Sequence, residues 1–121
     1  MKILIVDDHI AIRSHLQKCL EKHGYEAVTA ANGEIALKKA AEIGPDLILM
    51  DIKMPVMDGL EALRQLKAGE NTAGIPVVML TGMDELEDEN LGMSLGADAY
   101  IKKPVVVADV LRLVEKYKAL P

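Results

Sequence analysis

Short apolar runs alternate with longer amphipathic stretches along the whole chain. This alternation is typical of strands and helices that follow one another around a parallel sheet. The first, third and fourth runs are apolar throughout, as expected of strands covered on both faces, whereas the second and fifth are mixed and are predicted at the sheet edges. The predicted strands are Ile3 to Val6, Tyr25 to Ala30, Leu47 to Met50, Val77 to Leu80 and Ala99 to Ile101.

The stretches between the strands carry helix boundaries as well as helical periodicity. Asn32 and Asp58 can cap the second and third helices, because their side-chain oxygens accept hydrogen bonds from the first backbone amides. Gly24 and Gly44 can adopt the left-handed conformation that ends a helix. The fourth helix is expected from about Asp84 to Leu95. The other helices have apolar stripes at Ile12, Leu16, Cys19 and Leu20; at Ala36, Leu37, Ala40 and Ala41; at Leu60, Leu63 and Leu66; and at Val110, Leu111, Val114 and Tyr117.

Length and hydrophobicity narrow the class of protein. A chain of 121 residues can bury one sizeable core but not two, so we expect one domain over residues 1–121. Half of the residues are hydrophobic, yet no apolar run approaches the roughly 18 residues that a membrane-spanning helix needs. We therefore expect a soluble protein with no membrane insertion.

The N-terminus and the cysteine count favour a cytoplasmic protein, and the charge argues against a nucleic-acid-binding domain. The first residues lack the apolar length and the cleavage site of a secretory signal. Cys19 is the single cysteine and cannot form an internal disulfide, in keeping with a reducing compartment. A net charge of −5 and an aromatic content limited to three tyrosines argue against direct nucleic acid binding by this domain.

Polar residues of particular types occur where the predicted strands end. Asp7 and Asp8 follow the first strand, Asp51 the third, Thr81 the fourth and Lys103 the fifth. Parallel strands point the same way, so these side chains are expected to converge at the sheet edge where open α/β folds bind ligands. An aspartate after a strand is often only a helix cap. The joint occurrence at four strand ends favours a site over independent caps.

The residue types indicate phosphoryl chemistry with a hard metal ion. Three clustered carboxylates repel one another unless a cation lies among them, and carboxylate oxygens suit Mg²⁺ better than zinc. An aspartate can act as a nucleophile and form an acyl phosphate. Thr81 and Lys103 are suited to stabilise the oxygens of a transferring phosphoryl group.

At these residues the chain resembles the receiver domain of two-component response regulators, including the stand-alone chemotaxis type. The similarity extends along the whole chain and rests on five segments taken together. They are Ile5-Val6-Asp7-Asp8, the segment Leu49-Met50-Asp51-Ile52-Lys53-Met54-Pro55-Val56-Met57-Asp58-Gly59, Val78-Met79-Leu80-Thr81-Gly82, Gly96-Ala97-Asp98-Ala99-Tyr100 and Lys102-Lys103-Pro104.

The resemblance implies a fold and an architecture. The fold is a doubly wound, flavodoxin-like α/β fold with five helices and a five-stranded parallel sheet of order 2-1-3-4-5. The Lys103-Pro104 peptide is expected to be cis. Lys102 is expected to point to the other face of its strand from Lys103.

The resemblance also implies residue roles. Asp51 corresponds to the phosphorylated aspartate, and Mg²⁺ is expected on Asp7, Asp8, Asp51 and the main-chain carbonyl of Lys53. Thr81 corresponds to the hydroxyl that moves onto the phosphoryl group, and Lys103 to the lysine that pairs with it. Tyr100 corresponds to the aromatic residue whose ring turns inward with that movement; the alternative is an edge-strand tyrosine packed on the fourth helix.

As implied by the resemblance, the chain is a signalling switch rather than a dedicated metabolic enzyme. The phosphoryl donor is expected to be a sensor histidine kinase or a phosphotransfer protein. The output is expected from the surface of the fourth helix, fifth strand and fifth helix, toward a downstream protein or an effector domain outside this chain.

Three positions depart from the pattern of the resembled family. Gly82 stands where alanine is common, and Val105 stands where an aromatic residue often follows the Lys-Pro pair. Ala99 stands where one large subfamily of DNA-binding regulators tends to carry an acid. The departure at Ala99 argues against placing the chain in that subfamily and against the dimer contacts that are usual there.

Three histidines and the cysteine offer other interpretations. His15, Cys19 and His23 are spaced four residues apart on the first helix, but eight residues of helix span about 12 Å, so His15 and His23 cannot share one ion. We expect a buried Cys19 beside partly exposed histidines. His9 is expected at the start of the first helix, near the pocket, rather than as a phosphorylated histidine.

Two other function classes remain as alternatives. A phosphohydrolase with an aspartyl-phosphate intermediate commonly carries a second aspartate two residues after the nucleophile, and Lys53 occupies that position here. A docking module that works without phosphorylation is favoured by no residue, because the site residues are all present. The sequence leaves open the stimulus, the kinase, the downstream protein, the phosphoryl lifetime, the oligomeric state and whether the chain is part of a longer regulator.

Overall fold

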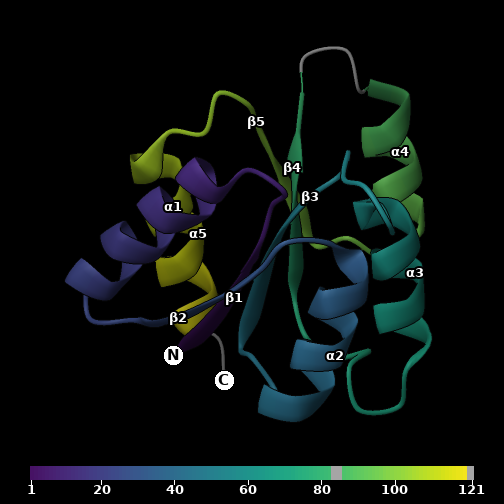
Figure 1. The fold of residues 1–121 in the computed structure, drawn as a ribbon, viewed down its shortest axis with the longest axis horizontal. Coiled ribbons are helices and arrows are strands. Elements are labelled where there is room, and N and C mark those ends of the chain that lie inside the picture. The colour runs from purple at the N-terminus through teal and green to yellow at the C-terminus, as the bar shows by residue number, and fades with distance from the viewer. Residues whose placement is uncertain (83–85, 120–121) are drawn as a thin grey trace.

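The computed structural model describes residues 1–82 and 86–119, without the side chains of residues 86–89. Five parallel strands form one sheet in the order β2-β1-β3-β4-β5, so the predicted order is confirmed and the mixed strands lie at the edges (Figure 1). The elements are β1 (Lys2–Val6), α1 (Ile10–Lys22), β2 (Glu26–Ala30), α2 (Gly33–Ile43), β3 (Leu47–Asp51), α3 (Gly59–Ala68), β4 (Val77–Thr81), α4 (Leu86–Ser94), β5 (Ala99–Lys102) and α5 (Val107–Lys118).

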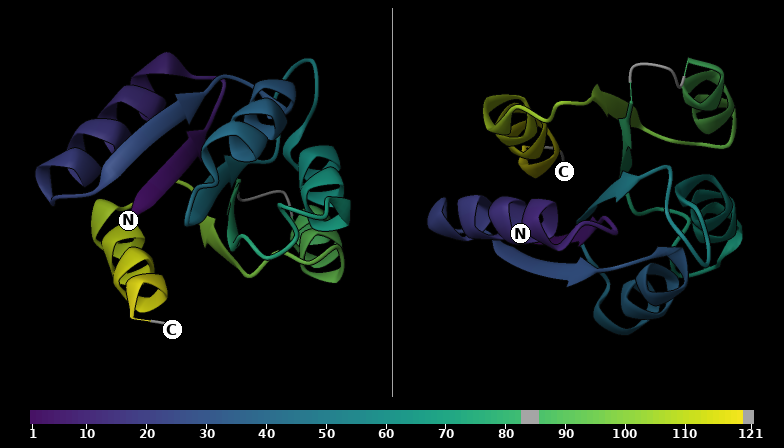
Figure 2. Two further views of the ribbon diagram at one scale, coloured as in Figure 1. Left: turned by 90° about the horizontal axis from the view of Figure 1, so that it is seen from below. Right: turned by 45° about the horizontal axis from the view of Figure 1, so that its top comes forward.

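The helices cover both faces of the sheet. α1 and α5 lie on one face, and α2, α3 and α4 lie on the other (Figures 1 and 2). The residues of β1 alternate between the two cores: Ile3 and Ile5 pack on the side of α1 and α5, whereas Leu4 and Val6 pack with α2 and α3. Burial on both faces explains why the central strands are continuous apolar runs.

Several predicted boundaries are confirmed by the local geometry. The side chain of Asn32 accepts a hydrogen bond from the amide of Ile35, and that of Asp58 accepts one from the amide of Glu61, both at 2.9 Å. Gly24 and Gly44 have φ angles of 88° and 57°, the left-handed conformation expected at a helix end.

Other boundaries differ by one or two residues. β3 and β4 each extend one residue further than predicted, because Asp51 and Thr81 still take part in the ladder, paired with Leu80 and Lys102. β2 begins at Glu26 rather than at the preceding tyrosine. α4 ends at Ser94, one residue before the predicted end, and the predicted first residues, 84 and 85, lie outside the described part of the chain.

α5 is tied to the rest of the domain near its C-terminal end. Val110 and Val114 are buried against β5 and α1, as the apolar stripe predicted. The hydroxyl of Tyr25 donates a hydrogen bond to the carboxylate of Glu115. This hydrogen bond raises the pKa of Tyr25, because it favours the protonated phenol. Among the described residues, no helix combines the length and the apolar character needed to cross a membrane.

Candidate functional site

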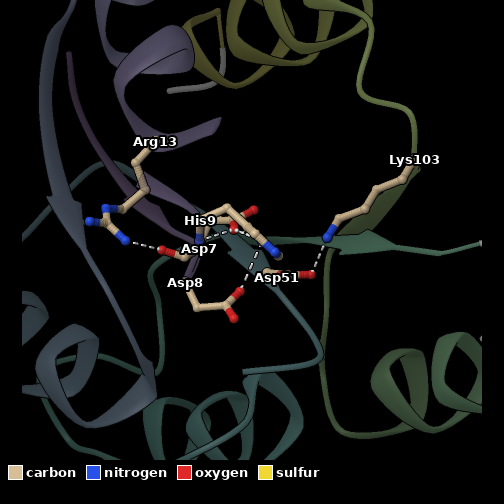
Figure 3. Close-up of polar contacts among 6 residues, drawn as sticks. All are labelled: Asp7, Asp8, His9, Arg13, Asp51 and Lys103. Atoms are coloured by element: carbon tan, nitrogen blue, oxygen red, sulfur yellow. Dashed lines mark hydrogen bonds and ion pairs between the residues drawn. The ribbon is translucent and has the colours of Figure 1, made fainter. Parts of the chain in front are cut away.

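The ends of β1 and β3 bring three carboxylates together. Asp7 and Asp8 follow β1, and Asp51 is the last residue of β3. Ligand atoms of these aspartates and of His9 all lie within 4.8 Å of one another (Figure 3). Asp7 is 0% exposed and Asp51 is 2% exposed, while Asp8 is half-buried at the rim. The predicted convergence of the three acids is therefore confirmed.

Asp7 is fixed by the chain on both sides of it. Its amide donates to the carbonyl of Ala30 at 3.1 Å, which continues the β1–β2 ladder beyond the last strand residue. Its Oδ1 atom accepts a hydrogen bond of 2.9 Å from the amide of His9. The guanidinium of Arg13, one turn into α1, donates to the carbonyl of Asp7 at 2.7 Å. His9, just before α1, thus holds the side chain of Asp7, and Arg13, in the first turn of α1, holds its backbone.

Lys103 provides the cation of the site. Its Nζ atom lies 2.7 Å from Oδ1 of Asp51, and this hydrogen bond is also an ion pair (Figure 3). The backbone amide of Lys103 donates to the carbonyl of Thr81 at 2.6 Å, so the residue after β5 is aligned on the end of β4. The Lys103-Pro104 peptide is cis, as expected. Lys102, the last residue of β5, is exposed, and its expected orientation opposite to Lys103 stays a prediction.

The environment of Asp51 acts on its acidity in two opposing ways. Burial raises the pKa of the Asp51 carboxyl, and the charges of Asp7 and Asp8 act in the same direction. The hydrogen bond from Lys103 lowers the pKa, but the balance stays above the ordinary value. The ionised form of Asp51 is therefore less stable in this pocket than it would be in water.

The donor set fits a hard divalent cation. Three carboxylates face one lysine, which leaves a surplus of negative charge at neutral pH. Among the described residues, Oδ2 of Asp7 and Oδ1 of Asp8 are buried side-chain oxygens without a hydrogen-bond partner. Oδ1 of Asp8 does lie 3.2 Å from Nδ1 of His9, but the hydrogen bond of that ring nitrogen goes to Asp7. Buried oxygens left without donors are the ligands that Mg²⁺ prefers.

The loop after β3 approaches the backbone of Asp51 closely. The amide of Gly59, the first residue of α3, donates to the carbonyl of Ile52 at 2.8 Å. A Cβ atom on Gly59 would lie 2.0 Å from the carbonyl oxygen of Asp51, so only glycine fits here. In the same loop, Val56 has a φ of 70°, an unfavourable conformation for a β-branched residue.

The remaining predicted site residues are not all at the acidic pocket. Thr81 is fully buried at the end of β4, next to Lys103. Lys53 is exposed in the loop that follows β3. Tyr100 lies on β5 with 45% of its surface exposed. Because side chains alternate along a strand, it lies on the opposite face from the buried residue Ile101. The roles expected for these residues stay predictions.

The first helix contributes more to the site than the sequence indicated. His9 was expected only near the pocket, yet its backbone and its ring both contact Asp7, and Arg13 was not predicted as a neighbour at all. The signal available in the sequence was a polar residue at the start of α1, His9, and a second one a turn later, Arg13. The expectation of a buried Cys19 is wrong, because that residue is only half-buried, with its sulfur 3.9 Å from Nε2 of His15.

Curated relatives are response regulators of about twice the length of this chain. The chain is 48% identical over 103 residues to the alkaline phosphatase synthesis transcriptional regulatory protein PhoP of Bacillus subtilis, covering 85% of this chain and 42% of PhoP. It is 39% identical over 119 residues to the transcriptional regulatory protein PrrA of Mycobacterium tuberculosis, covering 98% of this chain and 49% of PrrA. The similarity to transcriptional regulators exists in spite of the departure at Ala99.

Solved structures of similar length share the fold and the sequence family. The chemotaxis protein CheY4 of Vibrio cholerae superposes with a TM-score of 0.89 at 34% identity, covering 96% of this chain and 97% of CheY4. A CheY-like response regulator receiver domain protein of Methanospirillum hungatei gives a TM-score of 0.88 at 39% identity, covering 97% of this chain and 93% of that protein. The family described as the response regulator receiver domain matches residues 3–115. The chain therefore belongs to the receiver domains of two-component response regulators, which are signalling switches controlled by phosphorylation.

Proposed function

We propose that Asp51 accepts the phosphoryl group and that Asp7, Asp8, Asp51 and the carbonyl of Lys53 hold Mg²⁺ beside it. The observation that carries this proposal is the cluster of three carboxylates within 4.8 Å, with two buried oxygens that lack donors. The ion, when bound, neutralises charge on the acids and on the phosphoryl oxygens. The same proposal treats residues 1–121 as one receiver domain located in the cytoplasm.

The transfer step uses residues that are already in contact. A carboxylate oxygen of Asp51 attacks phosphorus, the bond between phosphorus and the donor's histidine nitrogen breaks, and that nitrogen keeps the electron pair. The amino group of Lys103 lies 2.7 Å from Asp51, so after the transfer it can bind and stabilise the negatively charged phosphoryl oxygens. The hydroxyl of Thr81 supplies a second contact to the same group. Later attack by water on phosphorus returns Asp51 and inorganic phosphate.

The donor and the output complete the proposal. A sensor histidine kinase or a phosphotransfer protein provides the phosphohistidine. New contacts from Thr81 and Lys103 to the phosphoryl group favour one of two conformations of the surface formed by α4, β5 and α5, with Tyr100 as the moving aromatic residue. The chain spans less than half of PhoP and PrrA, so a downstream protein or an effector domain outside this sequence reads that surface.

The assignment of Asp51 is tested by phosphorylation with a small donor. The chain is incubated with phosphoramidate and Mg²⁺, and intact mass spectrometry measures the addition of one phosphoryl group. Asp51→Asn is expected to abolish the addition. Asp46→Asn is the matched control, because Asp46 is an exposed aspartate just before β3, at its other end. Equal labelling of Asp51→Asn and the unsubstituted chain would refute the assignment.

A further inference from the structure

His9 lies at the mouth of the acidic pocket and has no part in the proposed function. It is the residue just before α1, and its side chain is 65% exposed. Its Nδ1 atom lies 3.2 Å from Oδ1 of Asp7 and 3.2 Å from Oδ1 of Asp8 (Figure 3). The imidazole therefore adds a nitrogen donor to a pocket in which the aspartates offer only oxygen.

The spacing of these atoms matches the ligands of one metal ion. Bonds of about 2.1 Å place neighbouring ligands about 3.0 Å apart around an octahedral ion and about 3.4 Å apart around a tetrahedral ion. The two distances from Nδ1 of His9 to the carboxylate oxygens, 3.2 Å each, lie between these values. Asp51 completes the group, whose ligand atoms all lie within 4.8 Å of one another. The four residues are therefore close enough to share a single cation.

Two buried oxygens beside the imidazole lack a positive partner. Among the described residues, Oδ2 of Asp7 and Oδ1 of Asp8 are buried without a hydrogen bond, and the side chain of Asp7 is 0% exposed. The backbone of His9 is fixed next to them, because its amide donates to Oδ1 of Asp7 at 2.9 Å. A substitution of the His9 side chain retains this backbone contact. The contribution of the imidazole can therefore be removed by itself.

A nitrogen donor changes which metal ions the pocket prefers. The carboxylates attract any divalent cation, so they discriminate little between ions of equal charge. Mg²⁺ takes oxygen ligands, whereas Ni²⁺ and Zn²⁺ also bind imidazole nitrogen well. An imidazole among the ligands therefore adds affinity for Ni²⁺ and Zn²⁺ and little for Mg²⁺.

We infer that His9 is a further metal ligand of the acidic pocket and makes it favour imidazole-binding divalent cations, Ni²⁺ and Zn²⁺, over Mg²⁺. Nδ1 binds the ion through its lone pair, and the ring proton is then on Nε2. The inference rests on the proposed function in one respect, since the ion shares Asp7, Asp8 and Asp51 with the proposed Mg²⁺ site. It assigns to His9 a role in metal selectivity that phosphoryl transfer does not require.

Two metal ions of equal charge test this inference on the full chain. Ni²⁺ and Mg²⁺ are the probes, because Ni²⁺ binds imidazole well and Mg²⁺ does not. Isothermal titration calorimetry measures both dissociation constants. His9→Phe keeps an aromatic ring without nitrogen, and His9→Gln keeps a hydrogen-bond donor without imidazole. Both variants are expected to weaken Ni²⁺ binding about tenfold or more and to leave Mg²⁺ binding within about twofold.

His15→Phe is the matched control. His15 is another exposed histidine of α1, and its Nε2 atom lies near the sulfur of Cys19 rather than near the aspartates. Because Ni²⁺ is paramagnetic, broadening of backbone amide signals in NMR spectra locates the ion. Broadening is expected around residues 7–9 and 51, both in the unsubstituted chain and in His15→Phe.

Three results would overturn the inference. The first is unchanged Ni²⁺ affinity in both His9 variants. The second is an equal loss of Ni²⁺ and Mg²⁺ affinity, because His9 would then position Asp7 without binding the ion. The third is broadening confined to the surroundings of His15 and Cys19.

Labelling by phosphoramidate separates this inference from the proposed function. Normal labelling of Asp51 with Mg²⁺, together with Ni²⁺ binding that does not depend on His9, refutes the role of His9 alone. Ni²⁺ binding that depends on both His9 and Asp7, tested with Asp7→Asn, supports the inference even if Asp51 is not labelled. In that case only the phosphoryl assignment fails.

Discussion

The amino group of Lys103 lies 2.7 Å from a carboxylate oxygen of Asp51, although the two residues are 52 positions apart. Asp51 is the last residue of β3, and Lys103 follows β5. These two strands are not neighbours, because β4 lies between them. The ion pair therefore bridges over the end of β4, where Thr81 is buried. Lys103 thus occupies a carboxylate oxygen of Asp51, the residue that the proposed function also assigns to the metal ion.

Lys103→Ala should strengthen binding of Mg²⁺. Removal of the lysine takes a competing cation away from Asp51, and a partly exposed ion pair contributes about 1 kcal/mol, or roughly a fivefold change in affinity. Isothermal titration calorimetry measures the dissociation constant. Lys102→Ala, at an exposed neighbouring position, is the control and should leave it unchanged. Weaker binding by Lys103→Ala would show that the lysine supports the ion rather than competes with it.

Asp51→Asn should stabilise the metal-free chain at neutral pH. The raised pKa of Asp51 means that the folded state binds its proton more tightly than the unfolded state, so stability falls as pH rises above the ordinary value of 3.8. Asparagine removes this loss, which we expect to amount to about 1 kcal/mol at pH 7, a Tm increase of roughly 4 °C.

Thermal unfolding in EDTA from about pH 3 to about pH 8 measures the effect of Asp51→Asn, because this range covers both the protonated and the ionised carboxyl of Asp51. The advantage of the variant should be absent below the ordinary value of 3.8 and should grow to a plateau as pH rises. Saturating Mg²⁺ should reduce it, because the variant lacks one carboxylate ligand. Asp46→Asn should give no such gain, since Asp46 accepts a hydrogen bond from the amide of Lys2 at the exposed end of β3.

Gly59→Ala should destabilise the chain and disturb the acidic pocket together. The added Cβ would lie 2.0 Å from the carbonyl oxygen of Asp51, so the loop or the strand end has to move. We expect a loss of about 1 to 3 kcal/mol in urea unfolding and weaker Mg²⁺ binding. Gly74→Ala is the matched control, because nothing lies within 4 Å of its Cβ position. Similar losses in both variants would mean that the close approach is not the cause.

Val56→Asn should stabilise the chain. Val56 has a φ of 70° and is 75% exposed, so the substitution relieves an unfavourable conformation while it removes little buried surface. Asparagine tolerates the left-handed region, and we expect a gain of about 1 kcal/mol in urea unfolding. Val56→Thr keeps a β-branched residue in the same left-handed conformation and should stay within about 0.5 kcal/mol of the unsubstituted chain. A loss in Val56→Asn would indicate that the valine side chain has contacts worth more than the strain.

The order and the type of the elements were predictable because they depend on local rules. Continuous apolar runs such as Leu47 to Met50 require cover on both faces, and Asn32 and Asp58 cap the helices that they were expected to cap. The strand order followed from the resemblance to a family, since apolar patterning alone does not choose which strands are neighbours. The ends of β3 and β4 were placed one residue short because pairing with adjacent strands, rather than hydrophobicity, decides where a ladder stops.

The sequence by itself determined that Asp7, Asp8, Asp51 and Lys103 would meet, because parallel strands bring their C-terminal ends to one edge. Only the tertiary structure decided how they meet. Which oxygens remain without donors, how Lys103 reaches Asp51 over β4, and that Arg13 and His9 hold Asp7 all depend on distances between segments far apart in the chain. Periodicity and capping are properties of neighbouring residues, whereas these contacts arise from packing that no local pattern encodes.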